Sequence, residues 1–185
     1  MVNTLIEKGV LSPIAVEQKK EFSLPNPGHH KVRLTAEQRA AADILASKVG
    51  QGFSVTLLDG VTGSGKTEVY FEAVAQALEQ GKQALVMVPE ISLTTQWLSR
   101  FERRFGVVPA KWHSNLGNKE RADTWKAIVE NRAKVIIGAR SALYLPYADL
   151  GVIIVDESHD SSYKQEDAVN YQAVSYTHLR AHETS

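Results

Sequence analysis

Residues 59–67 read Asp-Gly-Val-Thr-Gly-Ser-Gly-Lys-Thr, and this stretch decides which fold the sequence predicts. Its fixed positions hold the residues that the phosphate-binding P-loop pattern G-x-x-x-x-G-K-T requires, namely Gly60, Gly65, Lys66 and Thr67. The apolar run at 54–58 before it predicts a strand, and the pattern at 66–79 after it predicts a helix. A strand, a glycine-rich loop and a helix in this order are the context in which the motif binds phosphate.

The residue types of this loop suit a triphosphate. Glycine has no Cβ, so the chain at Gly63 and its neighbours can bend tightly and bring backbone N–H groups close to the phosphates. A helix that begins at Lys66 directs the positive end of its dipole toward the anion. In such loops the lysine contacts the β- and γ-phosphates, and the next hydroxyl, here Thr67, binds Mg²⁺. The predicted nucleotide contacts are Gly60, Thr62, Gly63, Ser64, Gly65, Lys66 and Thr67; the alternative is a glycine-rich turn with a chance lysine.

Composition limits the size of the fold and the classes of protein to which the chain can belong. The 185 residues include 43% hydrophobic residues, which suits one α/β domain and an additional segment. Lys plus Arg and Asp plus Glu number 21 each, so net charge neither favours nor excludes nucleic acid. The chain contains no cysteine, which excludes disulfides and cysteine-bound metal and fits a cytoplasmic location. The sequence contains neither a signal peptide nor an apolar run of the ~18 residues that a membrane span needs.

Short apolar strands alternate with helices along the chain. Further strands are predicted at 84–88, 108–112, 134–137 and 151–155, and helices at 36–49, 92–105 and 118–130. This alternation predicts an α/β fold with a parallel sheet and helices on both faces, whose ligands bind at the carboxyl ends of the strands. The helix residues predicted to face inward are Ala40, Ile44, Leu45, Val49, Leu93, Trp97, Leu98, Phe101, Ala122, Trp125 and Val129.

Two acids follow the most apolar strand. Asp156 and Glu157 come directly after Val-Ile-Ile-Val at 152–155. An acid at a strand tip, paired with a P-loop upstream, predicts that Asp156 holds Mg²⁺ and that Glu157 orients the attacking water. Without the P-loop, a strand that ends in solvated acids would be the simpler interpretation.

The order of a P-loop and then Asp-Glu-x-His resembles the DExH helicases of superfamily 2. Several strings are similar to the replication-restart DNA helicases of the primosome in particular. They are Asp-Gly-Val-Thr-Gly-Ser-Gly-Lys-Thr-Glu-Val-Tyr at 59–70, Val-Pro-Glu-Ile-Ser-Leu-Thr-Thr-Gln at 88–96, Gly-Ala-Arg-Ser-Ala at 138–142 and Tyr-Lys-Gln-Glu-Asp at 163–167. The resemblance implies a RecA-like ATPase lobe, ATP and Mg²⁺ as cofactors, branched or single-stranded DNA and other primosome proteins as partners, and no membrane partner.

The resemblance also implies roles for other residues. Gln38 lies in a region that reads adenine in these helicases, although Thr35 and Gln38 also form the pattern of a helix capping box. Arg140 and Ser141 follow a strand tip, where a DNA phosphate contact or a solvated arginine are both reasonable. His159 either couples the nucleotide site to DNA or is a structural histidine. Tyr163, Lys164 and Tyr171 form an aromatic and basic loop that suits single-stranded DNA or ordinary packing.

The chain divides into four predicted parts. By resemblance, residues 1–12 are expected to be the tail of an upstream winged-helix domain. Residues 13–33 are predicted to form a linker that contains several prolines. Residues 34–173 are the first ATP-binding lobe of the helicase, and 174–185 resemble a non-native adaptor tail. A motor of this kind needs a second lobe with an arginine finger, and zinc is expected only in a downstream cysteine-rich part. The expected function is therefore the first lobe of an ATP-dependent DNA helicase of replication restart; the alternatives are another superfamily 2 translocase and, for this stretch alone, a non-catalytic nucleotide-binding module.

Overall fold

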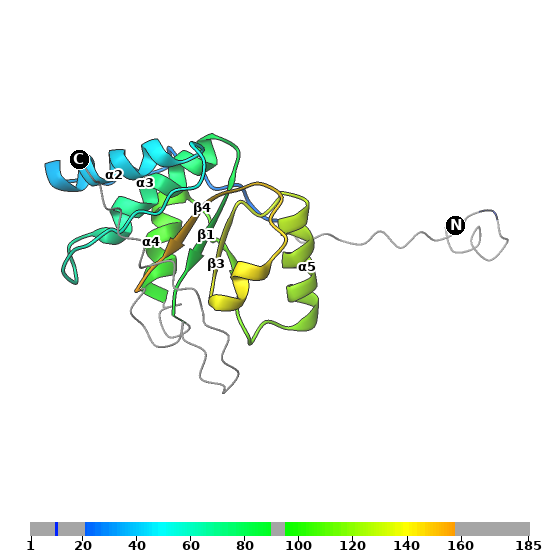
Figure 1. The fold of residues 1–185 in the computed structure, drawn as a ribbon. Coiled ribbons are helices and arrows are strands. Elements are labelled where there is room, and N and C mark those ends of the chain that lie inside the picture. Colours follow the sequence, from blue (N-terminus) through cyan, green and yellow to red (C-terminus); the bar gives the residue numbers. More distant parts are fainter. Residues whose placement is uncertain (1–9, 11–20, 90–94, 158–185) are drawn as a thin grey trace, which may run out of the picture.

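The computed structural model describes residue 10, residues 21–89 and residues 95–157. Helix α2 spans Ala36–Lys48 and helix α3 spans Lys66–Glu79, after which the chain alternates between strands and helices (Figure 1). The later elements are β1 (Gln83–Met87), α4 (Thr95–Phe105), β2 (Ala110–Trp112), α5 (Asn118–Val129), β3 (Val135–Gly138), the 3₁₀ helix η2 (Arg140–Tyr144) and β4 (Leu150–Val155).

The four strands form one parallel sheet in the order β2-β3-β1-β4. The central strand β1 pairs with β3 through Leu85 and Ile136 and with β4 through Leu85 and Ile153. Because all strands run the same way, their carboxyl ends lie at one edge of the sheet. The residues that follow Met87, Trp112, Gly138 and Val155 therefore begin at that edge.

Helices cover both faces of the sheet. On one face α3 and α4 pack against Val86 and Ile137, and on the other α5 and η2 pack against Leu85 and Ile136 (Figure 1). Helix α2 lies outside α3, which it contacts through Leu45 and through Val49, the residue that follows its last turn. The predicted α/β class and the parallel sheet with helices on both faces are thus confirmed.

The strand predicted at 54–58 is wrong. These residues have no regular secondary structure, and Val55 and Leu57 are exposed. The alternating apolar pattern favours a strand only when a neighbouring strand accepts its backbone hydrogen bonds. Within the described part of the chain, β4 pairs with β1 alone, so the segment before the P-loop gains no such partner.

Helix α5 turns a different face inward from the one predicted, and α2 buries only part of its predicted face. Helix α5 buries Thr124, Ala127 and Ile128, whereas Trp125 is 46% exposed. At α2, Leu45 packs on the core and Val49 is buried as predicted. Ala40 and Ile44 are exposed, Ile44 by 55%, and Ala42 is buried in their place. Both helices have only a small apolar side, so small residues pack at the contact and larger ones remain outside. Trp97 and Phe101 of α4 are buried as predicted.

The described residues ahead of α2 contact the body of the domain. The Arg104 side chain of α4 donates to the Pro27 carbonyl oxygen over 2.6 Å and to Glu72 of α3 over 2.9 Å. The backbone N–H of Asn26 donates to the Phe105 carbonyl oxygen. The boundary of the linker at residue 33 stays a prediction.

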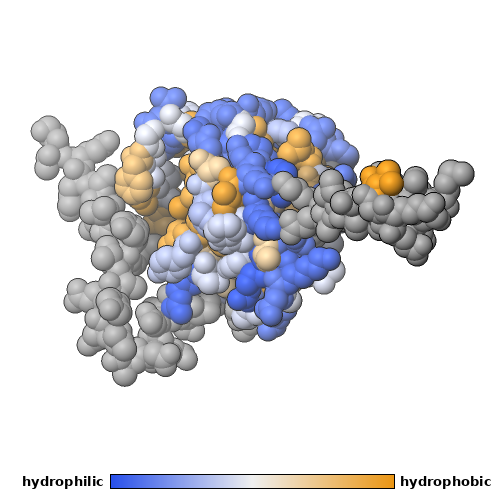
Figure 2. All heavy atoms as spheres, turned by 90° about the vertical axis from the view of Figure 1, so that its right-hand side faces the viewer, coloured by the Kyte–Doolittle hydropathy of each residue, from blue (hydrophilic) through white to orange (hydrophobic). Residues whose placement is uncertain are grey.

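The face of the molecule on the α5 side is largely polar (Figure 2). Figure 2, which looks at the α5 side of Figure 1, shows a face covered mostly by hydrophilic side chains. Over the described ranges, no helix is both long and apolar enough to span a bilayer.

Candidate nucleotide site

The loop at 59–65 leads directly into α3. Gly65 is the N-cap residue of α3 with φ 85°, and Gly63 has φ 81°, both in the left-handed region that glycine adopts without strain. The Ser64 N–H donates to the Val61 carbonyl oxygen over 3.1 Å and closes the turn. Among the described residues, no side chain caps the first N–H groups of α3, so these donors suit an anion.

Gln38 joins α2 to this loop. Its Oε1 accepts from Thr35 N over 3.0 Å, and the Thr35 hydroxyl accepts from Gln38 N, which confirms the capping box. Its Nε2 donates to the Ser64 carbonyl oxygen over 2.8 Å. A Cβ on Gly65 would lie 2.5 Å from this Nε2, so a larger residue there would displace the Gln38 amide, and the positive φ independently favours glycine. Both ends of the amide therefore have partners, and the adenine contact stays a prediction.

Lys66 lies across its own loop. Its ammonium donates to the carbonyl oxygens of Gly60 over 2.5 Å and Val61 over 3.3 Å. A Cβ on Gly60 would lie 2.8 Å from the Ser64 hydroxyl, so this glycine permits the close return of the loop. Thr62 and Gly63 at the tip are exposed. The loop thus presents a positive charge and backbone donors on the same side of α3.

Asp156 and Glu157 lie at the carboxyl end of β4. Asp156 N donates to the Met87 carbonyl oxygen, which continues the β1–β4 pairing by one residue. The carboxylate accepts from the Tyr70 hydroxyl at Oδ2 over 2.8 Å and from Glu157 N at Oδ1 over 3.0 Å. Glu157 has φ 51°, so the chain turns sharply there and its side chain is exposed. Tyr70 therefore brings the second turn of α3 against the acids at the sheet edge.

The donor set at this edge suits Mg²⁺. Thr67 lies one turn before Tyr70 on α3, so the two side chains share one face of the helix. A hydroxyl and a carboxylate are hard oxygen ligands, and Mg²⁺ commonly takes one or two protein ligands and completes its shell with phosphates and water. In the described ranges no cluster of three or more His, Asp or Glu side chains could hold a metal by itself.

Burial changes the acidity of Tyr70. The side chain is 4% exposed, and burial, followed by the negative charge of Asp156, raises the pKa of Tyr70 far above the ordinary tyrosine value. The phenol therefore stays protonated at neutral pH and can donate to the carboxylate.

Two of the residues predicted to contact DNA lie at the sheet edge. Arg140 and Ser141 begin η2 directly after β3, and both are exposed. They lie at the same edge as Asp156, because β3 and β4 both pair in parallel with β1. The other predicted DNA or coupling residues lie outside the described residues: His159, Tyr163, Lys164 and Tyr171.

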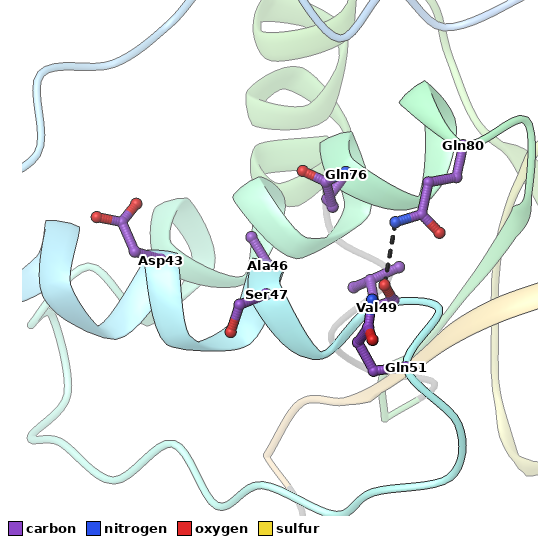
Figure 3. Close-up of a pocket in the computed structure, with 7 residues that line it drawn as sticks. All are labelled: Asp43, Ala46, Ser47, Val49, Gln51, Gln76 and Gln80. Atoms are coloured by element: carbon purple, nitrogen blue, oxygen red, sulfur yellow. Dashed lines mark hydrogen bonds between the residues drawn. The ribbon is translucent and has the colours of Figure 1, made fainter.

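A polar hollow of about 400 Å³ lies elsewhere, between the C-terminal halves of α2 and α3 (Figure 3). Gln80 closes one side of it by donating to the Val49 carbonyl oxygen over 3.0 Å. Gln76 also lines it and lies near the end of α3 remote from Lys66. This hollow is therefore separate from the P-loop, whose ligand would lie against an open sheet edge.

Sequence reasoning missed two neighbours of the site. The sequence predicts no separate role for Tyr70, and it predicts that Trp97 belongs to the core, where it is indeed buried. Its indole N–H donates to the Tyr70 oxygen over 2.8 Å. The signal that could have identified Tyr70 is its spacing. Tyr70 follows Thr67 by three positions and Lys66 by four, and residues at these spacings lie on the same face of a helix.

The comparison with known families agrees with this geometry. The model of the DEAD/DEAH box helicase family matches residues 35–182, which include the P-loop and both acids. The chain belongs to the DEAD/DEAH box helicase family. Membership implies nucleotide binding, and the RecA-like lobe predicted from the resemblance fits the observed sheet.

The individual relatives that the chain resembles include replication restart proteins from several bacteria. The chain is 44% identical to replication restart protein PriA of Bacillus subtilis over 179 residues, which are 93% of this chain and 22% of that protein. It is 47% identical to PriA of Haemophilus influenzae over 141 residues, or 76% of this chain and 19% of the relative. It is 40% identical to PriA of Synechocystis over 182 residues, which are 97% of this chain and 22% of the relative. The predicted similarity to the replication-restart helicases is confirmed, and the chain spans about a fifth of the length of these relatives.

Proposed function

We propose that this chain is the first motor lobe of an ATP-dependent DNA helicase that restarts replication. The observation that carries the proposal is a hydrogen bond between the P-loop helix and the end of β4. The Tyr70 hydroxyl of α3 donates to Asp156 Oδ2 over 2.8 Å. It brings a phosphate-binding loop and an acid pair to one sheet edge, which is the arrangement that hydrolysis of a nucleotide needs. The similarity to PriA supports DNA and primosome proteins as partners.

Each residue then has a proposed task. Lys66 leaves the carbonyl oxygens of its loop and contacts the β- and γ-phosphates. The N–H groups at the start of α3 bind the same phosphates. Thr67 and Asp156 hold Mg²⁺, which when bound neutralises charge on the phosphates. Glu157, exposed at the turn after β4, accepts a proton from the attacking water.

Two further contacts belong to the proposal. The Gln38 amide nitrogen carries two hydrogens, of which one is used on Ser64, and the second is proposed to contact adenine. Arg140 and Ser141 are proposed to contact a DNA phosphate at the neighbouring strand end. His159, Tyr163, Lys164 and Tyr171 are proposed to continue this DNA surface.

The 185-residue chain alone is proposed to bind nucleotide weakly and to turn it over little. Gly60 to Gly63 are exposed, and the segment before them pairs with no strand of the described sheet. Ordering such a loop around a ligand costs free energy that reduces affinity. Robust DNA-stimulated hydrolysis by the chain alone would contradict this statement.

The test of nucleotide binding compares two lysine variants. A fluorescent ATP analogue should bind the chain, and Lys66→Ala should lower its affinity at least tenfold. Lys119→Ala is the matched control, because Lys119 is exposed on α5, on the opposite face of the sheet from α3, and should leave affinity unchanged. Equal binding by wild type and Lys66→Ala would refute the P-loop assignment.

The test of motor function uses a chimaera. Residues 34–173 replace the matching segment of Bacillus subtilis PriA, and the product is assayed on forked DNA. We expect DNA-stimulated ATP hydrolysis and strand separation, both abolished by Lys66→Ala. Hydrolysis and movement along DNA without strand separation would instead indicate a translocase.

A further inference from the structure

Three side chains from three different elements form a hydrogen-bond chain beneath the nucleotide site. The Trp97 indole N–H of α4 donates to the Tyr70 oxygen of α3 over 2.8 Å. The Tyr70 hydroxyl donates to Asp156 Oδ2 at the end of β4, also over 2.8 Å. Trp97 is 7% exposed and Tyr70 is 4% exposed, so water competes little for these bonds.

The chemistry of the three groups fixes the direction of these bonds. An indole nitrogen only donates and an ionised carboxylate only accepts, whereas a phenol has one proton and an oxygen that accepts. Trp97 must therefore donate to Tyr70, and the single phenol proton is left for Asp156. No rotation of the hydroxyl satisfies both neighbours in another way.

These bonds restrict how the Asp156 carboxylate can turn. Oδ2 is held by Tyr70 and Oδ1 accepts from Glu157 N over 3.0 Å, while the backbone N–H of Asp156 is bonded to β1. The carboxylate plane is thus set before any ligand arrives.

We propose that Tyr70 is a positioning residue, which orients the Asp156 carboxylate for Mg²⁺ and, through Trp97, makes that orientation depend on helix α4. The proposal rests on the proposed function of Asp156 as a Mg²⁺ ligand. A metal that demands near-ideal octahedral geometry gains from a carboxylate that cannot rotate. The same bond carries a movement of α4 to the acid, since Trp97 stacks on Phe101 and edge-on against Phe71 within the core.

Tyr70→Phe is the direct variant. It removes only the hydroxyl and keeps the ring, which packs at right angles to Phe71 with centroids 5.3 Å apart. Tyr147→Phe is the matched control, because Tyr147 also donates its partly buried hydroxyl over 2.8 Å, to the Ala142 carbonyl oxygen on the other side of the sheet.

The first measurement is a Mg²⁺ titration of fluorescent ATP-analogue binding to the chain. Tyr70→Phe should bind the analogue in EDTA within twofold of wild type but need about tenfold more Mg²⁺, as expected from losing one hydrogen bond to a charged group. Trp97→Phe should change the requirement in the same direction by a smaller factor. If Tyr70→Phe raises the Mg²⁺ requirement no more than Tyr147→Phe does, the inference is overturned while the P-loop function stands.

The second measurement needs no nucleotide. In ¹⁵N-labelled protein the Trp97 indole resonance is identified by its loss in Trp97→Phe. Asp156→Asn should shift that resonance in the wild-type background and leave it unchanged in the Tyr70→Phe background, because the effect passes through the phenol. An equal shift in both backgrounds, or none in either, overturns the hydrogen-bond chain. Failure of the wild-type chain to bind the analogue would contradict only the proposed function.

Discussion

The Nε2 atom of Gln38 lies 2.8 Å from the carbonyl oxygen of Ser64, so the first turn of α2 is bonded to the phosphate-binding loop across 26 residues of sequence. The same side chain closes the capping box of α2 with Thr35. One glutamine therefore stabilises a helix start and positions a loop, and the two roles can be separated by mutation.

Gln38→Glu separates these roles. A glutamate can still accept from Thr35 N and close the capping box, but it has no N–H to donate to Ser64. We expect the free energy of unfolding to change by less than about 1 kcal/mol and nucleotide affinity to fall several-fold. Urea denaturation and analogue binding measure the two quantities. A loss of stability with unchanged affinity would show that the contact with Ser64 has no role in binding.

Gly65→Ala should disturb the loop itself. The residue has φ 85°, and a Cβ would meet Gln38 Nε2 at 2.5 Å, so we expect a loss of about 1–3 kcal/mol together with loss of nucleotide binding. Gly117→Ala is the control, since Gly117 is also a helix N-cap but has φ −62° and open space around it. It should cost less than about 1 kcal/mol. Similar melting temperatures for the two variants would contradict the expectation.

Arg104→Ala should be the most destabilising of the charge variants. Its side chain is 2% exposed and contacts Glu72, which is 16% exposed, and the Pro27 carbonyl oxygen. Without Arg104, the only charged partner that Glu72 keeps among the described ion pairs is the 45% exposed Arg39, 3.4 Å away. About 3 kcal/mol should therefore be lost, the lower end of the range for breaking a buried pair. Asp149→Ala breaks the pair with Lys82, in which Asp149 is 50% exposed, and should cost less than about 1 kcal/mol. Denaturant midpoints distinguish the two results.

Alkaline pH should destabilise the domain through its buried tyrosines. Burial raises the pKa of both Tyr70 and Tyr147 above the ordinary tyrosine value. In the unfolded chain these phenols ionise at about pH 10, whereas in the folded chain they stay protonated at that pH. Unfolding therefore releases protons, and the free energy of unfolding falls as pH rises. Tyr70 alone contributes at most about 1.4 kcal/mol per pH unit above that point.

Denaturant midpoints between neutral and strongly alkaline pH test this relationship. Tyr70→Phe and Tyr147→Phe together should flatten the decline, whereas Tyr144→Phe should not, because Tyr144 is 82% exposed. An unchanged slope in the double variant would show that other groups cause the alkaline loss.

Glu157→Gln should separate binding from hydrolysis in the chimaeric helicase. The amide keeps the size of the side chain but cannot accept a proton from water, so turnover should fall by about 10²–10⁴ while analogue affinity stays within twofold. Glu79→Gln, at the exposed end of α3, should change neither quantity. Loss of analogue affinity in Glu157→Gln would indicate a role in binding instead.

Local patterns predicted the regular elements well, because a helix or strand is specified by residues close together in sequence. The helix after the P-loop was predicted at 66–79 and is observed at Lys66–Glu79. The strand at 54–58 was wrong for the opposite reason, since a strand also needs a neighbour that the segment itself does not supply. The exposed Trp125 shows a related error, because a helix with few apolar residues does not specify which side packs.

The sequence by itself determined that a phosphate-binding loop, an acid pair and the alternating elements occur in this order, since glycine spacing, charge and apolar runs are properties of short stretches. Only the tertiary structure decided that Tyr70 contacts Asp156, 86 positions away, and that Gln38 contacts Ser64. Such contacts depend on how far each helix is rotated against the sheet. That rotation is set by the packing of many side chains together and not by any one of them.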